Sequence, residues 1–100
     1  MDPATALAGY RIVQEALTNA SRHTVDAQVS VHVSIVEDTC EILVANRGGE
    51  TIDLGRGSGF GLISMRERAK SVGGSLLAGP TKDGWTVEAT LPVESARVRR

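Results

Sequence analysis

Hydrophobic residues recur with two different spacings along the chain. A spacing of three to five positions predicts helices, and a spacing of two predicts strands. Residues 5 to 22 carry an apolar stripe at spacings of three to five, which is typical of an amphipathic helix. Asp2-Pro3 or Thr5 can begin this helix, because proline is tolerated in a first turn. The stripe consists of Leu7, Ile12, Val13, Ala16, Leu17 and Ala20.

The next segment alternates with a period of two. From Val29 to Ile35, valine and isoleucine alternate with serine and histidine, which predicts a strand with one buried face. Residues 40 to 45 are more continuously apolar and predict a more central strand. Glu37-Asp38 is a turn between the two, so they form a predicted hairpin.

The second half of the chain repeats the order of helix and strand pair. Residues 46 to 59 form a long loop rich in glycine, and loops of this length tend to be functional. A second amphipathic helix is predicted over 60 to 72, ended by Gly73-Gly74. Strands are predicted at 75 to 78 and 85 to 91. The buried stripe of this helix is predicted to be Leu62, Met65, Ala69 and Val72.

This order of elements indicates an α+β fold. Strands that come in adjacent pairs favour a mostly antiparallel sheet, with both helices on one face, as a two-layer sandwich. The length of 100 residues is enough for one domain with one core. We expect the domain over residues 1–93 and a basic tail over 94–100.

Composition and charge indicate in which cellular compartment the chain works. The net charge is −1, so no global field favours nucleic acid or a membrane surface. Cys40 is the one cysteine, so the chain has no internal disulfide, and a core position is expected for it. No apolar run reaches the roughly 18 residues of a membrane span, and residues 1 to 5 do not form a signal peptide. We expect a cytoplasmic domain, with a membrane anchor on a longer parent chain left open.

One face of the first helix carries candidate chemistry. Glu15, Asn19 and His23 are spaced by four, so successive side chains rotate only about 40° around the helix. An amide oxygen is a suitable hard ligand for Mg²⁺, and a nearby carboxylate can hold a water or take a proton. Imidazole and Arg22 can donate to phosphate oxygens. A solvated helix face is the alternative interpretation.

The run from Gly55 to Leu62 is a second candidate. Four alternating glycines precede a helix, and glycine lets backbone amides approach a ligand closely. A helix start offers free N–H groups to phosphate. The run lacks the strand context of a dinucleotide fingerprint and the lysine of a P-loop, and a flexible linker remains the alternative. Asn46, before Gly48-Gly49, can read a base edge, although a plain turn explains that pattern as well.

These segments together resemble a known family. The residues from Tyr10 to His23, YRIVQEALTNASRH, closely resemble the N box of sensor histidine kinases paired with helix-turn-helix response regulators. Gly59 to Arg68, GFGLISMRER, resembles the second glycine box and helix of the same subfamily, and Gly84 to Pro92 resembles the closing strand. The resemblance spans about residues 5 to 92 in the same order.

The resemblance implies the Bergerat ATP-binding fold shared by histidine kinases, gyrase, Hsp90 and MutL. ATP and Mg²⁺ are the implied cofactors, with Asn19 ligating the metal and Glu15 as the polarising catalytic carboxylate. The implied partners are a histidine-bearing dimerisation domain of the parent chain and, indirectly, a response regulator, with no nucleic acid and no direct membrane contact. The implied nucleotide-binding residues are Asn19, Arg22, His23, Asn46, Gly48, Gly57, Gly59, Phe60, Gly61, Leu62 and Thr86.

The sequence also departs from the family pattern. Asn46 stands where aspartate is usual, and Trp85 where threonine is common. The phosphoacceptor helix is absent from these residues, as is the strand that usually precedes the first helix. We therefore expect an ATP-dependent protein-histidine kinase domain that is inactive in autophosphorylation by itself. The alternatives are a non-catalytic nucleotide-binding module and a serine kinase of the anti-sigma-factor type.

Overall fold

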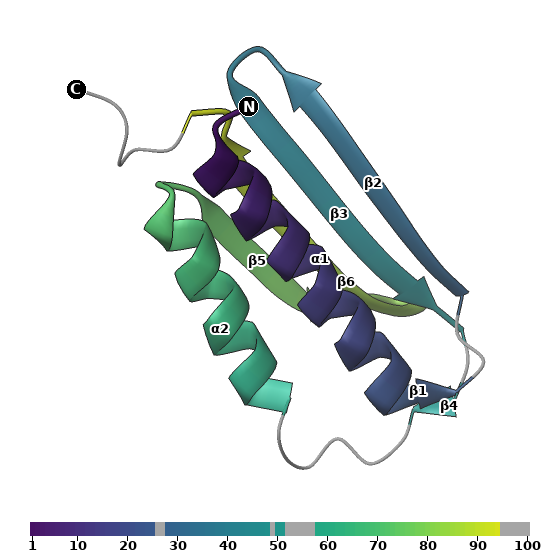
Figure 1. The fold of residues 1–100 in the computed structure, drawn as a ribbon. Coiled ribbons are helices and arrows are strands. Elements are labelled where there is room, and N and C mark those ends of the chain that lie inside the picture. The colour runs from purple at the N-terminus through teal and green to yellow at the C-terminus, as the bar shows by residue number, and fades with distance from the viewer. Residues whose placement is uncertain (26–27, 49, 52–57, 95–100) are drawn as a thin grey trace.

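The computed structural model of the chain describes residues 1–25, 28–48, 50–51 and 58–94. Side chains are described for these residues except 22–25, 50–51 and 58–60. In chain order (Figure 1) the elements are α1 (Pro3–His23), β1 (Thr24–Val25), β2 (Gln28–Val36), β3 (Thr39–Arg47), β4 (Glu50–Thr51), α2 (Ser58–Ser71), β5 (Ser75–Pro80) and β6 (Gly84–Pro92).

The main sheet has four strands in the order β2-β3-β6-β5, and every neighbouring pair is antiparallel. Both helices lie side by side on one face of this sheet (Figure 1). The predicted α+β sandwich is therefore confirmed. The two hairpins join through β3 and β6, and no strand precedes α1 in the described part of the chain.

The predicted elements are all present, with somewhat longer bounds. The predicted loop over 46 to 59 is partly wrong, because β3 continues to Arg47 and β4 pairs with β1 as a separate two-stranded ribbon. Residues 52–57 of this segment lie outside the described residues.

The start of α1 is fixed by capping and by contacts with the end of β6. The Asp2 side chain accepts a hydrogen bond from the Ala4 amide at 3.0 Å, so Asp2 caps the helix and Pro3 is its first residue. Thr5 is 1% exposed, and its hydroxyl donates to the Pro92 carbonyl at 3.0 Å. These contacts hold the long helix in register with the sheet.

Glycine ends α2 as the sequence predicts. Gly73 has a φ of 87°, in the left-handed region, and its amide donates to the Lys70 carbonyl. The Gly74 amide donates to the Ala69 carbonyl at 2.8 Å. A side chain at Gly74 would collide with the Thr90 carbonyl, so glycine also lets this turn lie against β6.

The core lies between the helices and the strands β3, β6 and β5. The predicted stripe of α2 is confirmed, with Leu62 partly buried. Cys40 is 3% exposed, which confirms its core position, and burial raises the pKa of its thiol. The core consists of Ala8, Ile12, Ala16, Cys40, Ile42, Val44, Met65, Ala69, Val72, Leu76, Val87, Ala89 and Leu91.

The predicted stripe of α1 is wrong at two positions. Leu7 is 56% exposed and Leu17 is 40% exposed, whereas Ile12 is fully buried. Leu7 and Leu17 lie about 140° around the helix from Ile12, on opposite sides of it, if each residue turns the helix by about 100°. Such positions point away from the sheet.

The predicted buried face of β2 is also wrong. All nine residues of β2 are exposed, including the alternating valines. The reason is visible in Figure 1: α1 lies over β3 and β6 and α2 over β5, so neither helix covers β2.

Candidate functional site

The polar face of α1 meets α2 at Gly61. A β-carbon placed on Gly61 would lie 2.5 Å from Asn19 Nδ2, 3.1 Å from Asn19 Oδ1 and 3.0 Å from Glu15 Oε2. A side chain at residue 61 would displace the Asn19 carboxamide, so Gly61 allows the carboxamide and the carboxylate to pack against the helix backbone. Glu15 and Asn19 therefore share one face, as their spacing of four predicts.

Gly61 lies in the first turn of α2, which begins at Ser58. The first four amides of an α-helix have no partner within the helix, and the helix dipole is positive at this end. The helices run in opposite directions, so the start of α2 lies beside the second half of α1 (Figure 1). Amide donors and the polar side chains of α1 thus occur at the same end of the domain.

The sheet contributes Asn46 and Trp85 at this end. The two residues are directly opposite in the pairing of β3 with β6, and both are half-buried. They share the parity of Val44 and Val87, which are buried beneath the helices, so both face the helix layer. Trp85 also packs against the core.

Two glycines shape the adjoining turn. A β-carbon on Gly84 would collide with the main chain of Asn46, so glycine is required where β6 begins beside β3. Gly48 has a φ of 71°, and its amide donates to the Asp83 carbonyl at 2.9 Å. The turn after β3 is thereby fixed to the loop before β6. Gly84 is not among the predicted site residues, although a glycine in a strand is a signal for a close backbone approach.

Among the predicted site residues with described side chains, Thr86 and Leu62 do not join Glu15 and Asn19. Thr86 pairs with Ala45 and has the parity of Glu88 and Thr90, so it faces the side of the sheet away from the helices. Leu62 is partly buried against the core. Gly57 lies outside the described residues, as do the side chains of Arg22, His23 and Phe60; Gly59 is described only as part of α2.

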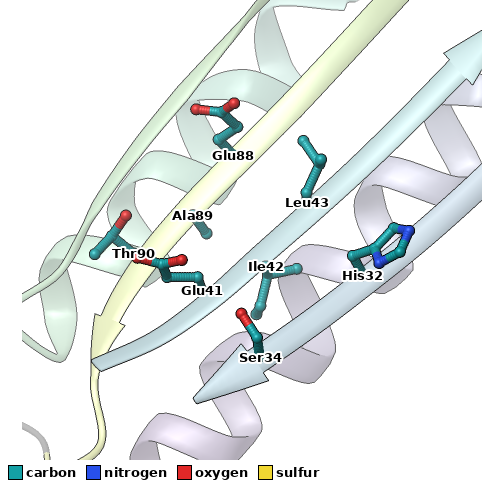
Figure 2. Close-up of a pocket in the computed structure, with 8 residues that line it drawn as sticks. All are labelled: His32, Ser34, Glu41, Ile42, Leu43, Glu88, Ala89 and Thr90. Atoms are coloured by element: carbon teal, nitrogen blue, oxygen red, sulfur yellow. The ribbon is translucent and has the colours of Figure 1, made fainter. Parts of the chain in front are cut away.

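A shallow pocket lies on the sheet face away from the helices (Figure 2). Its polar lining comes from β2, β3 and β6, and His32, Glu41 and Glu88 project from the open face. This pocket is separated from Asn19 and Gly61 by the whole sheet, so it plays no part in the site. The lining residues are His32, Ser34, Glu41, Ile42, Leu43, Glu88, Ala89 and Thr90.

The described residues contain no group of three or more His, Cys, Asp or Glu side chains placed to hold a metal ion. Asn19 is not one of these residue types, but its amide oxygen is also a suitable donor to a metal ion. Glu15 and Asn19 offer carboxylate and amide oxygens beside the same glycine, and oxygen donors are what Mg²⁺ prefers. With nucleotide phosphates supplying further oxygens, these residues fit a Mg²⁺–nucleotide complex.

No helix in the described part of the chain is sufficiently long and apolar to cross a membrane.

Comparison with known sequences identifies the family of the chain. The profile of the family described as histidine kinase-, DNA gyrase B- and HSP90-like ATPase matches residues 5–95. The chain is 41% identical over 66 residues to the sensor histidine kinase LiaS of Bacillus subtilis, which covers 65% of this chain and 18% of LiaS. It is 36% identical over 85 residues to the sensor histidine kinase YxjM of the same organism, covering 84% of this chain and 20% of YxjM. The chain thus spans about a fifth of the length of these relatives.

Comparison with solved structures supports the fold. The histidine kinase domain of the Erythrobacter litoralis EL346 blue-light activated histidine kinase superposes with a TM-score of 0.72 at 22% identity. The match covers 90% of this chain and 45% of that domain. Sequence profile, relatives and fold agree, and the chain belongs to the family of histidine kinase-, DNA gyrase B- and HSP90-like ATPases.

Proposed function

We propose that this chain binds Mg²⁺·ATP at the junction of α1 and α2 and presents the γ-phosphate to a histidine on a separate domain. The observation that carries the proposal is the approach of Gly61 to Asn19 and Glu15. It joins the polar face of α1 to a helix start that can donate amides to phosphate. Membership of an ATPase family supports the choice of nucleotide.

Each residue of the group has a proposed role. Asn19 would ligate the metal through its amide oxygen, and Glu15 would hold a water or accept a proton. Asn46 reads the purine edge with its amide, a neutral group that forms weaker hydrogen bonds than a carboxylate. Further residues complete the phosphate region in this proposal. They are Arg22 and His23 on α1, Gly57 before α2, and Gly59 and Phe60 in the first turn of α2.

Trp85 takes the place of Thr86 in this proposal. Trp85 faces the helix layer opposite Asn46, whereas Thr86 faces away from it. The indole supplies apolar surface beside the purine rather than a hydroxyl group. Its fluorescence also provides a probe of the site, because the chain has one tryptophan.

The chemistry relies on positioning and on charge. Asn19 and Glu15 would hold a metal ion that, when bound, would neutralise charge developing on the phosphates during transfer. The protein holds the γ-phosphorus near an attacking nitrogen and excludes water. The relatives named above are sensor histidine kinases of about four times this length, which supports an acceptor histidine on another part of the parent protein. A response regulator would then receive the phosphoryl group.

Phosphotransfer in trans tests the function. The chain is mixed with the histidine-bearing helical domain of the parent protein, Mg²⁺ and γ-labelled ATP. We expect acid-labile, base-stable phosphohistidine on the helical domain, and none with the chain omitted. ATP binding without transfer would instead support a non-catalytic nucleotide-binding module, which the departures at Asn46 and Trp85 favour. Phosphoserine on an added protein would support the serine kinase.

A further inference from the structure

The main sheet turns one amide side chain toward the helices. In the register of its four strands, the residues on the helix side have the parity of the buried residues Val44 and Val87. Asn46 is one of them, and the others are Val, Ile, Cys, Leu, Ala, Pro or Trp. Among the described residues of these strands, Asn46 and Trp85 are therefore the two helix-side residues whose side chains carry a hydrogen-bonding nitrogen.

The main chain beside Asn46 has hydrogen bonds of its own. The Gly48 amide donates to the Asp83 carbonyl at 2.9 Å, and the Thr81 amide donates to the Gly84 carbonyl at 2.8 Å. Gly84 lies so close to the Asn46 carbonyl that a β-carbon at residue 84 would collide with it. The amides of Gly48 and Thr81 are thus already engaged, so they do not supply the base contacts of the proposed site.

A carboxamide can pair with opposite hydrogen-bonding groups. One arm of the Asn46 amide accepts and the other donates, and rotation about the last side-chain bond exchanges them. Adenine carries an amino donor at position 6, whereas guanine carries an oxygen acceptor there. The same amide can therefore accept from adenine or donate to guanine. A carboxylate only accepts, so in the same place it would pair with the amino group and repel the oxygen.

Trp85 is equally tolerant of the base. It lies opposite Asn46 in the pairing of β3 with β6 and packs against the core, so the protein sets its position. Stacking of a base on an aromatic ring depends little on which base it is, because every base has a π face. The indole N–H can only donate, and adenine and guanine share the N7 acceptor. Neither of these two side chains rejects a purine for its group at position 6.

We propose that the nucleotide site accepts both adenine and guanine nucleotides, and that Asn46 is the residue responsible. This inference rests on the proposed function, because it takes the junction of α1 and α2 as the phosphate site and Asn46 as the reader of the base. A polar group left without a partner lowers affinity by roughly 5- to 150-fold. An amide that pairs with either purine avoids that loss, so the Kd values for ATP and GTP should differ by less than about tenfold.

Isothermal titration of nucleotides with Mg²⁺ into the native chain tests the specificity. ITP is the sharpest probe, because hypoxanthine has the oxygen of guanine at position 6 but lacks its 2-amino group. We expect ATP, ITP and GTP to bind with Kd values within about tenfold of one another, and CTP, with its smaller ring, to bind at least tenfold more weakly than ATP. Binding of ATP more than tenfold tighter than that of ITP would overturn the proposal. Equal binding of CTP would also overturn it, because the site would then not read the base.

The variant Asn46→Asp tests the role of the residue. The change keeps the shape of the side chain and leaves a group that only accepts hydrogen bonds. We expect ATP binding to be retained, and ITP and GTP binding to fall at least tenfold relative to ATP. Ser30→Asp is the matched control, because Ser30 is exposed on β2 opposite Ala45 and faces away from the helices. An ATP-to-ITP ratio that Asn46→Asp leaves unchanged, or that both variants change equally, would overturn the role of Asn46.

These titrations separate the inference from the proposed function. If no nucleotide binds to the native chain, the proposed function fails and the inference falls with it. If ATP binds and neither ITP nor GTP does, the proposed function stands and the inference alone is overturned. If ITP binds and GTP does not, the 2-amino group is excluded from the site, which overturns the proposal for guanine nucleotides.

Discussion

Gly61 lies so close to Asn19 that a β-carbon at residue 61 would displace the Asn19 carboxamide. The nearest atom to a β-carbon at Gly61 is Asn19 Nδ2, at 2.5 Å, and Glu15 Oε2 is 3.0 Å away. The glycine therefore sets the position of both side chains relative to the amides at the start of α2. This relationship connects two sequence segments that lie more than 40 residues apart.

The first prediction concerns Gly61→Ala. We expect Mg²⁺·ATP affinity to fall at least tenfold, because the added methyl group displaces the Asn19 carboxamide. Alanine is a better helix former than glycine by about 1 kcal/mol, so α2 itself should not be weakened. Affinity is measured by titration with Trp85 fluorescence, and stability by thermal unfolding. Gly79→Ala is the control, because a β-carbon there has no neighbour within 4 Å. Equal loss of affinity in both variants would contradict the assignment.

The second prediction concerns the core contact of α1. Ile12 is fully buried between α1 and the sheet, so Ile12→Ala leaves a cavity and should lower the free energy of unfolding by about 3 kcal/mol. Ile63→Ala changes a position that is 58% exposed on α2. Apart from any gain in helix propensity, it should lower the free energy of unfolding by less than about 0.5 kcal/mol. Urea unfolding followed by circular dichroism measures both. A small effect at Ile12 would show that α1 does not pack as described.

The third prediction concerns Thr5. Its buried hydroxyl donates to the Pro92 carbonyl, so Thr5→Val removes the donor and leaves the carbonyl without this hydrogen bond. We expect a loss of about 1 to 3 kcal/mol. Thr5→Ser keeps the hydroxyl group and should recover most of that difference after the lost methyl group is allowed for. If Thr5→Val and Thr5→Ser have equal free energies of unfolding, the hydrogen bond contributes nothing measurable to stability.

The fourth prediction concerns the pH dependence at Cys40. Burial raises the pKa of this thiol above its usual range, so the folded chain retains the proton to a higher pH than the unfolded chain. The contribution of Cys40 to stability is therefore complete well below the pKa of the unfolded thiol and is lost as pH rises through the folded pKa. Unfolding free energies between pH 8 and 10.5 should decline more steeply for the native chain than for Cys40→Ala. Parallel curves for the two proteins would contradict the raised pKa.

Local chemistry accounts for much of what the sequence predicts correctly. The spacing of Glu15 and Asn19 places both on one face of a helix, and Gly73-Gly74 ends α2, because these properties depend on a few neighbouring residues. Cys40 is buried as its apolar context predicts. The order of paired strands likewise predicts the antiparallel sheet.

The wrong predictions concern positions whose burial is decided by tertiary packing. The alternation in β2 correctly predicts a strand, but periodicity alone does not say whether a helix covers it, and here none does. Leu7 and Leu17 fit a broad stripe on α1, yet the sheet contacts only a narrow one. The approach of Gly61 to Asn19 likewise depends on how α1 and α2 pack, which no local pattern contains.

Tertiary structure also decides which residues of β6 face the helices. The resemblance to histidine kinases favours a hydroxyl group near the base, and Thr86 is the nearest threonine to that place in the sequence. The pairing of Asn46 with Trp85 instead turns Thr86 to the other face of the sheet. A shift of one residue along a strand reverses the face, so a sequence match accurate to one residue does not fix a site residue.

The central claim is tested most directly by isothermal titration of ATP into the native chain and Asn19→Ala, each with and without Mg²⁺. We predict saturable binding of one nucleotide that requires Mg²⁺ in the native chain and is weakened at least tenfold in Asn19→Ala. Both proteins should show the same thermal unfolding, because Asn19 is only half-buried. Absence of binding to the native chain, or equal Mg²⁺-dependent binding by the two proteins, would contradict a metal–nucleotide site at the junction of α1 and α2.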